Sequence, residues 1–72
     1  MRCLVTVDRA DKLLHRLGWS TGDLSYRKPG GFTVWQVTCH RDGQCIVTRA
    51  DRQLLAWNAA LKQAGALQQY FA

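Results

Sequence analysis

The sequence predicts a small α+β domain in which two helices pack on one face of a short antiparallel sheet. Three observations support this prediction. Two segments carry apolar residues at helical spacing, the segments between them are rich in β-branched and aromatic residues, and Asp42-Gly43 marks a tight hairpin turn. The expected order of elements is β-α-β-β-β-α.

Length and composition favour one domain over residues 1–72, because a chain of this size buries only enough surface on folding to form one core. The hydrophobic content of 47% is above the range of disordered chains. No apolar run approaches the roughly 20 residues of a membrane span, and an acid at Asp8 follows too early for a signal peptide. Three cysteines, an odd number, agree with a reducing compartment. We therefore expect a cytoplasmic protein without a membrane segment.

The N-terminal part is expected to form a strand followed by a helix. Residues 3–7 are apolar and β-branched, which favours a strand. Asp8 is the expected N-cap, with Asp11 in the capping-box position. Gly18 is expected to end the helix, and Trp19 to fold back beneath that end. The predicted buried stripe of this helix is Ala10, Leu13, Leu14 and Leu17.

Three further strands are expected in the middle of the chain. Residues 20–23 are polar and indicate a loop, and Pro29-Gly30-Gly31 indicates a turn. The Asp42-Gly43 turn pairs the two strands on either side of it. The expected strands are residues 24–28, 32–40 and 45–47.

The second helix is expected to start near Thr48, which with Asp51 repeats the capping pattern, and to end at Gly65. Its predicted buried stripe is Ala50, Leu54, Trp57, Leu61 and Ala64. The tail, residues 66–72, has Leu67, Tyr70 and Phe71 at helical spacing and is expected either to dock or to stay loose.

The plan of a helix, a three-stranded meander and a helix resembles the double-stranded-RNA-binding-domain (dsRBD-like) fold. Within that fold, residues 12–67 resemble the HicA-type toxins, small ribonucleases of toxin-antitoxin systems. The similar features are Leu13-Leu14 to Gly18-Trp19, Gly30-Gly31 before a strand, and the segment 61–67. The catalytic histidine of HicA-type enzymes lies in a Gly-Ser-His segment, whereas the matching stretch here is Gly30-Gly31-Phe32. The resemblance therefore implies the fold without the ribonuclease activity.

The formal charge of +5 and the resemblance together suggest a nucleic acid as ligand. In the double-stranded-RNA-binding plan, the first helix, the loop after the following strand and the start of the second helix contact phosphates and 2′-hydroxyls. The cations in these regions are Arg9, Lys12, Arg16, Arg27, Lys28, Arg49 and Arg52. At the second helix the RNA-binding domains carry Lys-Lys-x-Ala-Lys, where this chain has Arg49-Ala50-Asp51-Arg52, two cations and an acid. The leading hypothesis is a non-enzymatic module that binds the backbone of RNA or DNA, and the alternative is an ordinary solvated charged surface.

Strand alternation suggests a second hypothesis, a protein-protein interaction module, a small phage-type or antitoxin-like inhibitor, or a homodimer. Trp35, Val37, Cys39 and Ile46 are expected to face the helices. The other face holds Phe32, Val34, Gln36, Thr38, His40, Cys45 and Val47, and is too apolar for a plainly solvated surface. On the second helix, Leu55, Ala56 and Ala59 are off the predicted stripe. The predicted protein interface is Phe32, Val34, Leu55 and Ala59.

No catalytic or metal centre is predicted. The hairpin pairs His40 with Cys45 while Cys39 points away, so two ligands converge where a structural zinc needs four. The histidines and thiols do not form a recognised pair of nucleophile and base, so neither an enzyme nor a cofactor is expected. A third hypothesis, a ribonuclease related to the HicA type, requires His40 to be catalytic.

Overall fold

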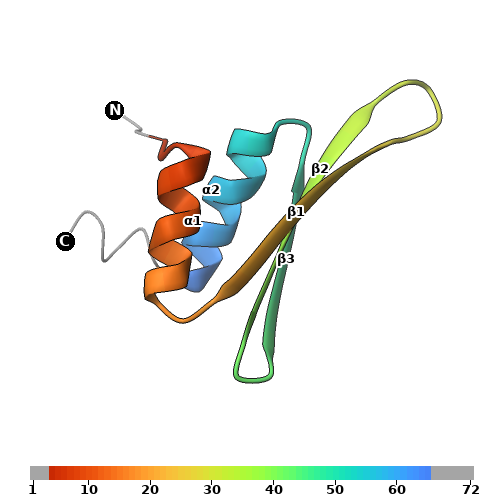
Figure 1. Cartoon of the computed structure of the whole chain (residues 1–72). Coiled ribbons are helices and arrows are strands. Elements are labelled where there is room, and N and C mark those ends of the chain that lie inside the picture. The colour runs from red at the N-terminus through yellow and green to blue at the C-terminus, as the bar shows by residue number, and fades with distance from the viewer. Residues whose placement is uncertain (1–3, 66–72) are drawn as a thin grey trace.

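The computed structural model describes residues 4–65 of the chain. Its elements are α1 (Val7–Arg16), β1 (Ser20–Arg27), β2 (Thr33–Arg41), β3 (Gln44–Ala50) and α2 (Gln53–Ala64). The strands form an antiparallel sheet in the order β1-β2-β3, and both helices lie on one side of it (Figure 1). The prediction of an α+β fold with two helices on one face of the sheet is confirmed. Neither of the two helices is long and apolar enough to span a membrane.

The N-terminal strand predicted at residues 3–7 is wrong for the residues that the structure describes. Residues 4–6 belong to no helix or strand, and Val7 already begins α1. The backbone of Val5 is bound instead by the side chain of Asn58 in α2. The Val5 N–H donates to Asn58 Oδ1 at 2.9 Å, and Asn58 Nδ2 donates to the Val5 carbonyl at 2.8 Å. These two bonds satisfy groups that a neighbouring strand would otherwise satisfy.

The N-cap of α1 is Thr6, so the prediction of Asp8 as the N-cap is wrong. Thr6 Oγ1 accepts from the Arg9 N–H at 3.3 Å, and Asp8 lies in the first turn, where an acid favours the helix dipole. The predicted stripe of α1 lies in the core, with Ala10 and Leu14 completely buried and the other two residues packed at its edge.

The end of α1 agrees with the prediction. Gly18 adopts the left-handed conformation at φ 91°, which lets the chain reverse. The N–H of Trp19 then donates to the Leu14 carbonyl at 3.0 Å, and the indole is buried beneath the helix end. The Arg41 guanidinium lies 4.5 Å from the centre of the Trp19 ring and donates to the Leu17 carbonyl at 3.1 Å. Arg41 thus ties the sheet to the end of α1.

β1 begins four residues earlier than predicted, inside the expected loop 20–23. It pairs with β2 continuously, from Ser20 opposite His40 to Arg27 opposite Thr33. The polar composition that indicated a loop has another cause. Thr21 and Asp23 face the helices and bond to their side chains, so these polar residues suit a strand at this position.

The hairpin between β2 and β3 is confirmed, with Cys39 opposite Ile46 and His40 opposite Cys45. Asp42 and Gly43 have φ of 48° and 80°, as the tight hairpin turn requires. β3 continues to Ala50, past the end predicted at residue 47.

The predicted start of the second helix at Thr48 is wrong. Thr48 is a buried residue of β3, and its hydroxyl donates to the Ala56 carbonyl at 2.7 Å instead of capping a helix. α2 starts at Gln53, with Arg52 as an N-cap that makes no side-chain capping bond. Gly65 ends α2 in the left-handed conformation at φ 76°, as predicted.

The core lies between the helices and the central strand. Val37 and Cys39 of β2 are completely buried, and so is Leu61 of α2. Ala56, expected to lie off the buried stripe, is also completely buried. Small residues at such positions let a helix approach its neighbours closely. The predicted behaviour of the tail, residues 66–72, falls outside the described residues.

We expect Asn58→Ala to lower the free energy of unfolding by about 2 to 3 kcal/mol, because it leaves the Val5 N–H and carbonyl without their partner. Urea unfolding followed by circular dichroism measures this loss. The exposed Gln63 on the same helix is the control, and Gln63→Ala should change stability by less than about 0.5 kcal/mol. Equal effects of the two substitutions would contradict the proposed anchoring of Val5.

Candidate nucleic-acid interface

Three of the predicted cations lie together on α1. Arg9, Lys12 and Arg16 are exposed and border a surface hollow of about 370 Å³. Lys12 Nζ lies 3.2 Å from Asp8 Oδ2, and both side chains are largely exposed, so this ion pair contributes little. The Arg16 guanidinium makes no hydrogen bond or ion pair within residues 4–65. The exposed side of α1 is therefore a surface that can bind an anion.

Two further cations lie at the tip of the β1–β2 hairpin. Arg27 ends β1, and Lys28 follows it, with its N–H donating to the Phe32 carbonyl at 2.7 Å. Gly30 and Gly31, in the turn between Lys28 and Phe32, have φ of 96° and 88°, a conformation that glycine adopts without strain. This hairpin extends beyond the helices (Figure 1). The exposed side chains of Arg27 and Lys28 have no ion pair with the part of the chain that the structure describes.

The remaining two predicted cations do not lie together. Arg52 is exposed just before α2, whose first turn contains no acid, so its charge adds to the positive end of the helix dipole. Arg49 was predicted at the start of this helix, but it lies in β3, because the strand continues through Thr48 to Ala50. Its Nε donates to Gln36 Oε1 at 3.0 Å on the side of the sheet that faces away from the helices.

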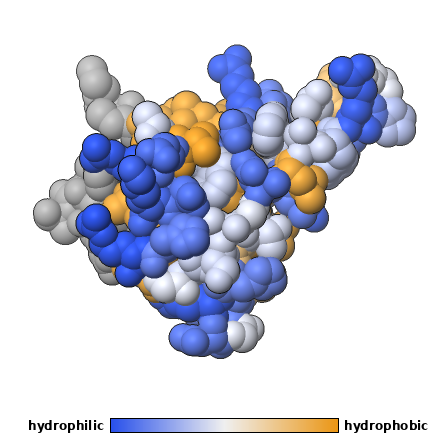
Figure 2. Space-filling model, in the orientation of Figure 1, coloured by the Kyte–Doolittle hydropathy of each residue, from blue (hydrophilic) through white to orange (hydrophobic). Residues whose placement is uncertain are grey.

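The structure therefore divides the predicted nucleic-acid residues into three regions, which are α1, the tip of the β1–β2 hairpin and the start of α2, and one separate residue, Arg49. Figure 2 shows hydrophilic side chains over α1, at the start of α2 and at the tip of the β1–β2 hairpin. Of the two predicted cations that lie within the strands, Arg27 alternates toward the helices and Arg49 belongs to the opposite face of the sheet.

The predicted protein-interface residues are also divided. Phe32 and Val34 belong to the β1–β2 hairpin, whereas Leu55 and Ala59 are in α2, on the other layer of the fold. Phe32 and Leu55 are exposed, and Val34 and Ala59 are half-buried. The four residues do not form a single surface.

A cluster of Asp11, His15 and Thr21 joins α1 to β1. Thr21 Oγ1 donates to Asp11 Oδ1 at 2.5 Å, and His15 Nε2 lies 3.1 Å from both of these oxygens. In a catalytic triad the imidazole uses one nitrogen toward the hydroxyl and the other toward the carboxylate. Here one nitrogen faces both groups, so the cluster positions α1 on the sheet. This contact could not be predicted from local sequence, since its partners belong to different elements.

Asp23 forms the corresponding connection between β1 and α2. Its Oδ2 accepts from Trp57 Nε1 at 3.0 Å and from Gln53 Nε2 at 2.8 Å. The polar composition around Asp23 predicted a loop, with no role for this side chain. The strand alternation of Thr21 and Asp23 was the signal that could have placed both side chains toward the helices.

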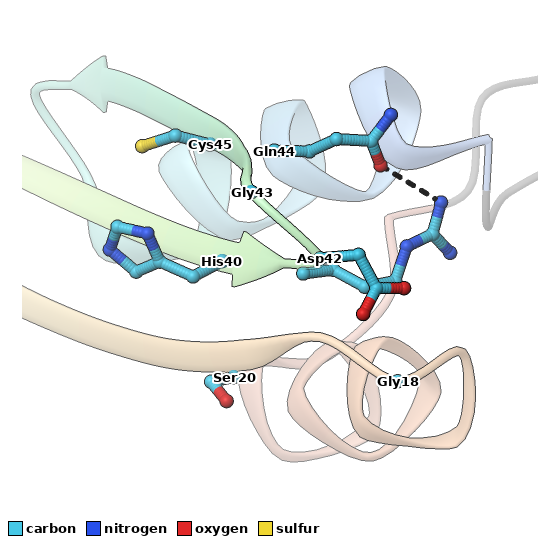
Figure 3. Close-up of a pocket in the computed structure, with 8 residues that line it drawn as sticks. Gly18, Ser20, His40, Asp42, Gly43, Gln44 and Cys45 are labelled. Carbon is cyan, nitrogen blue, oxygen red and sulfur yellow. Dashed lines mark hydrogen bonds between the residues drawn. The ribbon is translucent and has the colours of Figure 1, made fainter.

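A second hollow, of about 330 Å³, lies at the β2–β3 turn (Figure 3). His40 and Cys45 point to the same side of it from neighbouring strands, while Arg41 donates to Gln44 Oε1 at 3.2 Å. The imidazole of His40 makes no hydrogen bond with the described residues. Residues 4–65 contain no group of three or more His, Cys, Asp or Glu side chains able to hold a metal ion. The ribonuclease hypothesis based on His40 stays a prediction.

The two described cysteines differ in their environment. Cys39 is completely buried, and this burial raises the pKa of its thiol, with smaller contributions from Cys45 and Asp11. Cys45 is exposed, and both are free thiols. Cys39 therefore stays protonated and acts as a small apolar core residue.

In a Cys3→Ser, Cys45→Ser background, we expect Cys39 to react with a thiol reagent at pH 8 only as fast as the protein opens. In a Cys3→Ser, Cys39→Ala background, Cys45 should react at least about a hundredfold faster, because it needs no opening. Ellman absorbance measures the reaction rates of Cys39 and Cys45, and equal rates would contradict the burial of Cys39.

Because folding raises the pKa of the Cys39 thiol, the contribution of this group to the free energy of unfolding is complete below the ordinary thiol pKa. It is lost as the pH rises through the raised pKa of the folded state.

Comparison with known proteins adds no further evidence on this surface. A scan against protein-family models and searches of curated proteins and of solved structures found no match to this chain. The interpretation of its function therefore depends on the geometry and charge described above.

Proposed function

We propose that this protein is a non-enzymatic module that binds the backbone of duplex RNA or DNA through the helix side of the fold. The contacts come from α1, the tip of the β1–β2 hairpin and the start of α2. The observation that carries the proposal is the set of exposed cations in these three regions that have no ion pair within residues 4–65: Arg16, Arg27, Lys28 and Arg52.

The acidic side chains do little to neutralise these cations. The chain has ten Lys and Arg and five Asp and Glu. Asp11 accepts a hydrogen bond from Thr21, Asp23 accepts hydrogen bonds from Trp57 and Gln53, and Asp8 pairs with Lys12. Phosphates are the ligands that such unpaired cations favour, and their binding releases counterions.

The order of elements also supports the proposal. The order α1-β1-β2-β3-α2 agrees with the double-stranded-RNA-binding plan that the sequence resembles. In that plan the same three regions contact phosphates and 2′-hydroxyls, and sequence is read weakly. We therefore propose recognition of duplex shape and charge, without base-specific contacts.

Binding should weaken steeply with salt, and single charge removals should weaken it unequally. We expect Arg16→Gln and Lys28→Gln each to lower duplex affinity about threefold to tenfold at 50 mM salt and to reduce the salt slope by about 1. Lys62→Gln is the matched control, since it removes the same charge from the exposed C-terminal turn of α2, away from the three regions.

Fluorescence anisotropy with labelled duplex RNA and duplex DNA, at 50 and 200 mM salt, measures these affinities. Negligible binding to both duplexes at 50 mM salt would overturn the proposal. Equal losses for Lys62→Gln and Arg16→Gln would also overturn it, because net charge alone would then explain the binding. Intact probe RNA after incubation is expected of a non-enzymatic module.

A further inference from the structure

The face of the sheet that points away from both helices has no described element over it (Figure 1). Strand alternation defines this surface, which we name the open face. Its residues within the strands are Ser20, Gly22, Leu24 and Tyr26 of β1, Val34, Gln36, Thr38 and His40 of β2, and Cys45, Val47 and Arg49 of β3. The opposite face contains the buried Val37 and Cys39.

The open face exposes large apolar side chains. The exposed fractions are 50% for Leu24, 38% for Tyr26 and 39% for Val47. The pairing of β1 and β2 continues past Arg27 through the Lys28 N–H, which donates to the Phe32 carbonyl. Phe32 is 71% exposed, two residues before Val34, which pairs with Tyr26. Alternation therefore places both aromatic residues at this end of the open face, and the Phe32 ring lies beside Gly30.

The open face carries positive charge and no carboxylate. Asp8 and Asp11 are in α1, Asp23 faces α2, and the other two acids of the chain, Asp42 and Asp51, lie outside the strands. Arg49 lies opposite Gln36, which in turn lies opposite Leu24, so this cation is in the same row as an exposed apolar side chain. A ligand that fits this surface has negative charge and flat apolar groups.

We propose that the open face binds single-stranded RNA or DNA, with bases stacked on Tyr26 and Phe32 and a phosphate bound by Arg49. A single strand presents both its phosphates and the faces of its bases, whereas a duplex keeps its bases stacked inside. A second copy of this chain fits less well, because two molecules of charge +5 repel each other and no acid on this face pairs with Arg49.

This inference goes beyond the proposed duplex binding and does not depend on it. Most of the duplex surface is on the helix side, and Arg49 is the predicted cation that lies on the open face within the strands. Lys28, at the hairpin tip, is the single residue near both surfaces. The two proposals can therefore fail separately.

Gly22 provides a test that removes no contact. It lies within β1 on the open face, and a Cβ built there meets no atom within 4 Å. Gly22→Glu therefore adds a carboxylate to the open face without a clash, and Gly22→Gln adds a side chain of nearly the same size without the charge. The difference between the two variants measures electrostatic repulsion of the ligand.

The experiment is fluorescence anisotropy with labelled 12-nucleotide oligouridylate and oligothymidylate at 50 mM salt. We expect Tyr26→Ala and Phe32→Ala each to lower single-strand affinity about tenfold, the usual effect of losing one stacking ring. Tyr26→Phe should recover most of the loss in Tyr26→Ala, because it keeps the ring. Gly22→Glu should bind at least about fivefold more weakly than Gly22→Gln.

Circular dichroism first confirms that each variant is folded. Absence of single-strand binding by the wild-type protein would overturn the proposal, even if duplex binding is observed. Unchanged affinity in folded Tyr26→Ala and Phe32→Ala would overturn it as well. Light scattering in the absence of nucleic acid tests whether a second copy of this chain occupies the open face. A dimer that Gly22→Glu dissociates would assign the open face to self-association and overturn the proposal.

Discussion

The register of β2 is the constraint on which the rest of the structure depends. β2 is the central strand, paired on both sides, and its Val37 and Cys39 are completely buried beneath the helices. Because side chains alternate along a strand, a shift of one residue would expose both and bury Gln36 and Thr38 instead. The burial of two side chains therefore decides which face the helices cover and which face stays open.

Hydrogen bonds of polar side chains join α2 to the sheet and to the segment before α1, and they add to the stability that the small apolar core provides. A chain of 72 residues buries little apolar surface, so each connection between layers matters. Asn58 binds the backbone of Val5, Thr48 binds the carbonyl of Ala56, and Asp23 binds the indole of Trp57. A buried polar group that loses its partner costs more free energy than its hydrogen bond contributed, so these bonds fix the positions of the helices closely. The bond to Trp57 also occupies the carboxylate of Asp23, which is one of only five acids in the chain.

The two layers of the fold give the protein two different surfaces. The helix side carries isolated cations such as Arg16 and Arg52, which suit contacts with a regular array of phosphates. The open face combines Tyr26 with Arg49, which suits exposed bases and their phosphates together. Both proposals follow from one imbalance, ten Lys and Arg against five Asp and Glu, of which Asp11 and Asp23 already bond to other side chains.

The sequence by itself determined the features that depend on neighbouring residues. The Asp42-Gly43 hairpin, the buried stripe of α1 and the helix ends at Gly18 and Gly65 follow from local dihedral preferences and periodicity. The resemblance to the double-stranded-RNA-binding plan stays a prediction beyond the order and arrangement of the elements.

Only the tertiary structure decided the features whose partners are far apart in the sequence. Val5 is held by Asn58, 53 residues away, and so does not join the sheet. Thr48 is a residue type typical of a helix cap, and Asp23 is one typical of a loop. Both lie in strands, where α2 supplies the hydrogen-bond partners of their side chains. The extension of β3 in turn moved Arg49 from the expected helix start to the open face. A local pattern shows which bonds a residue can make, and packing decides which of them are satisfied.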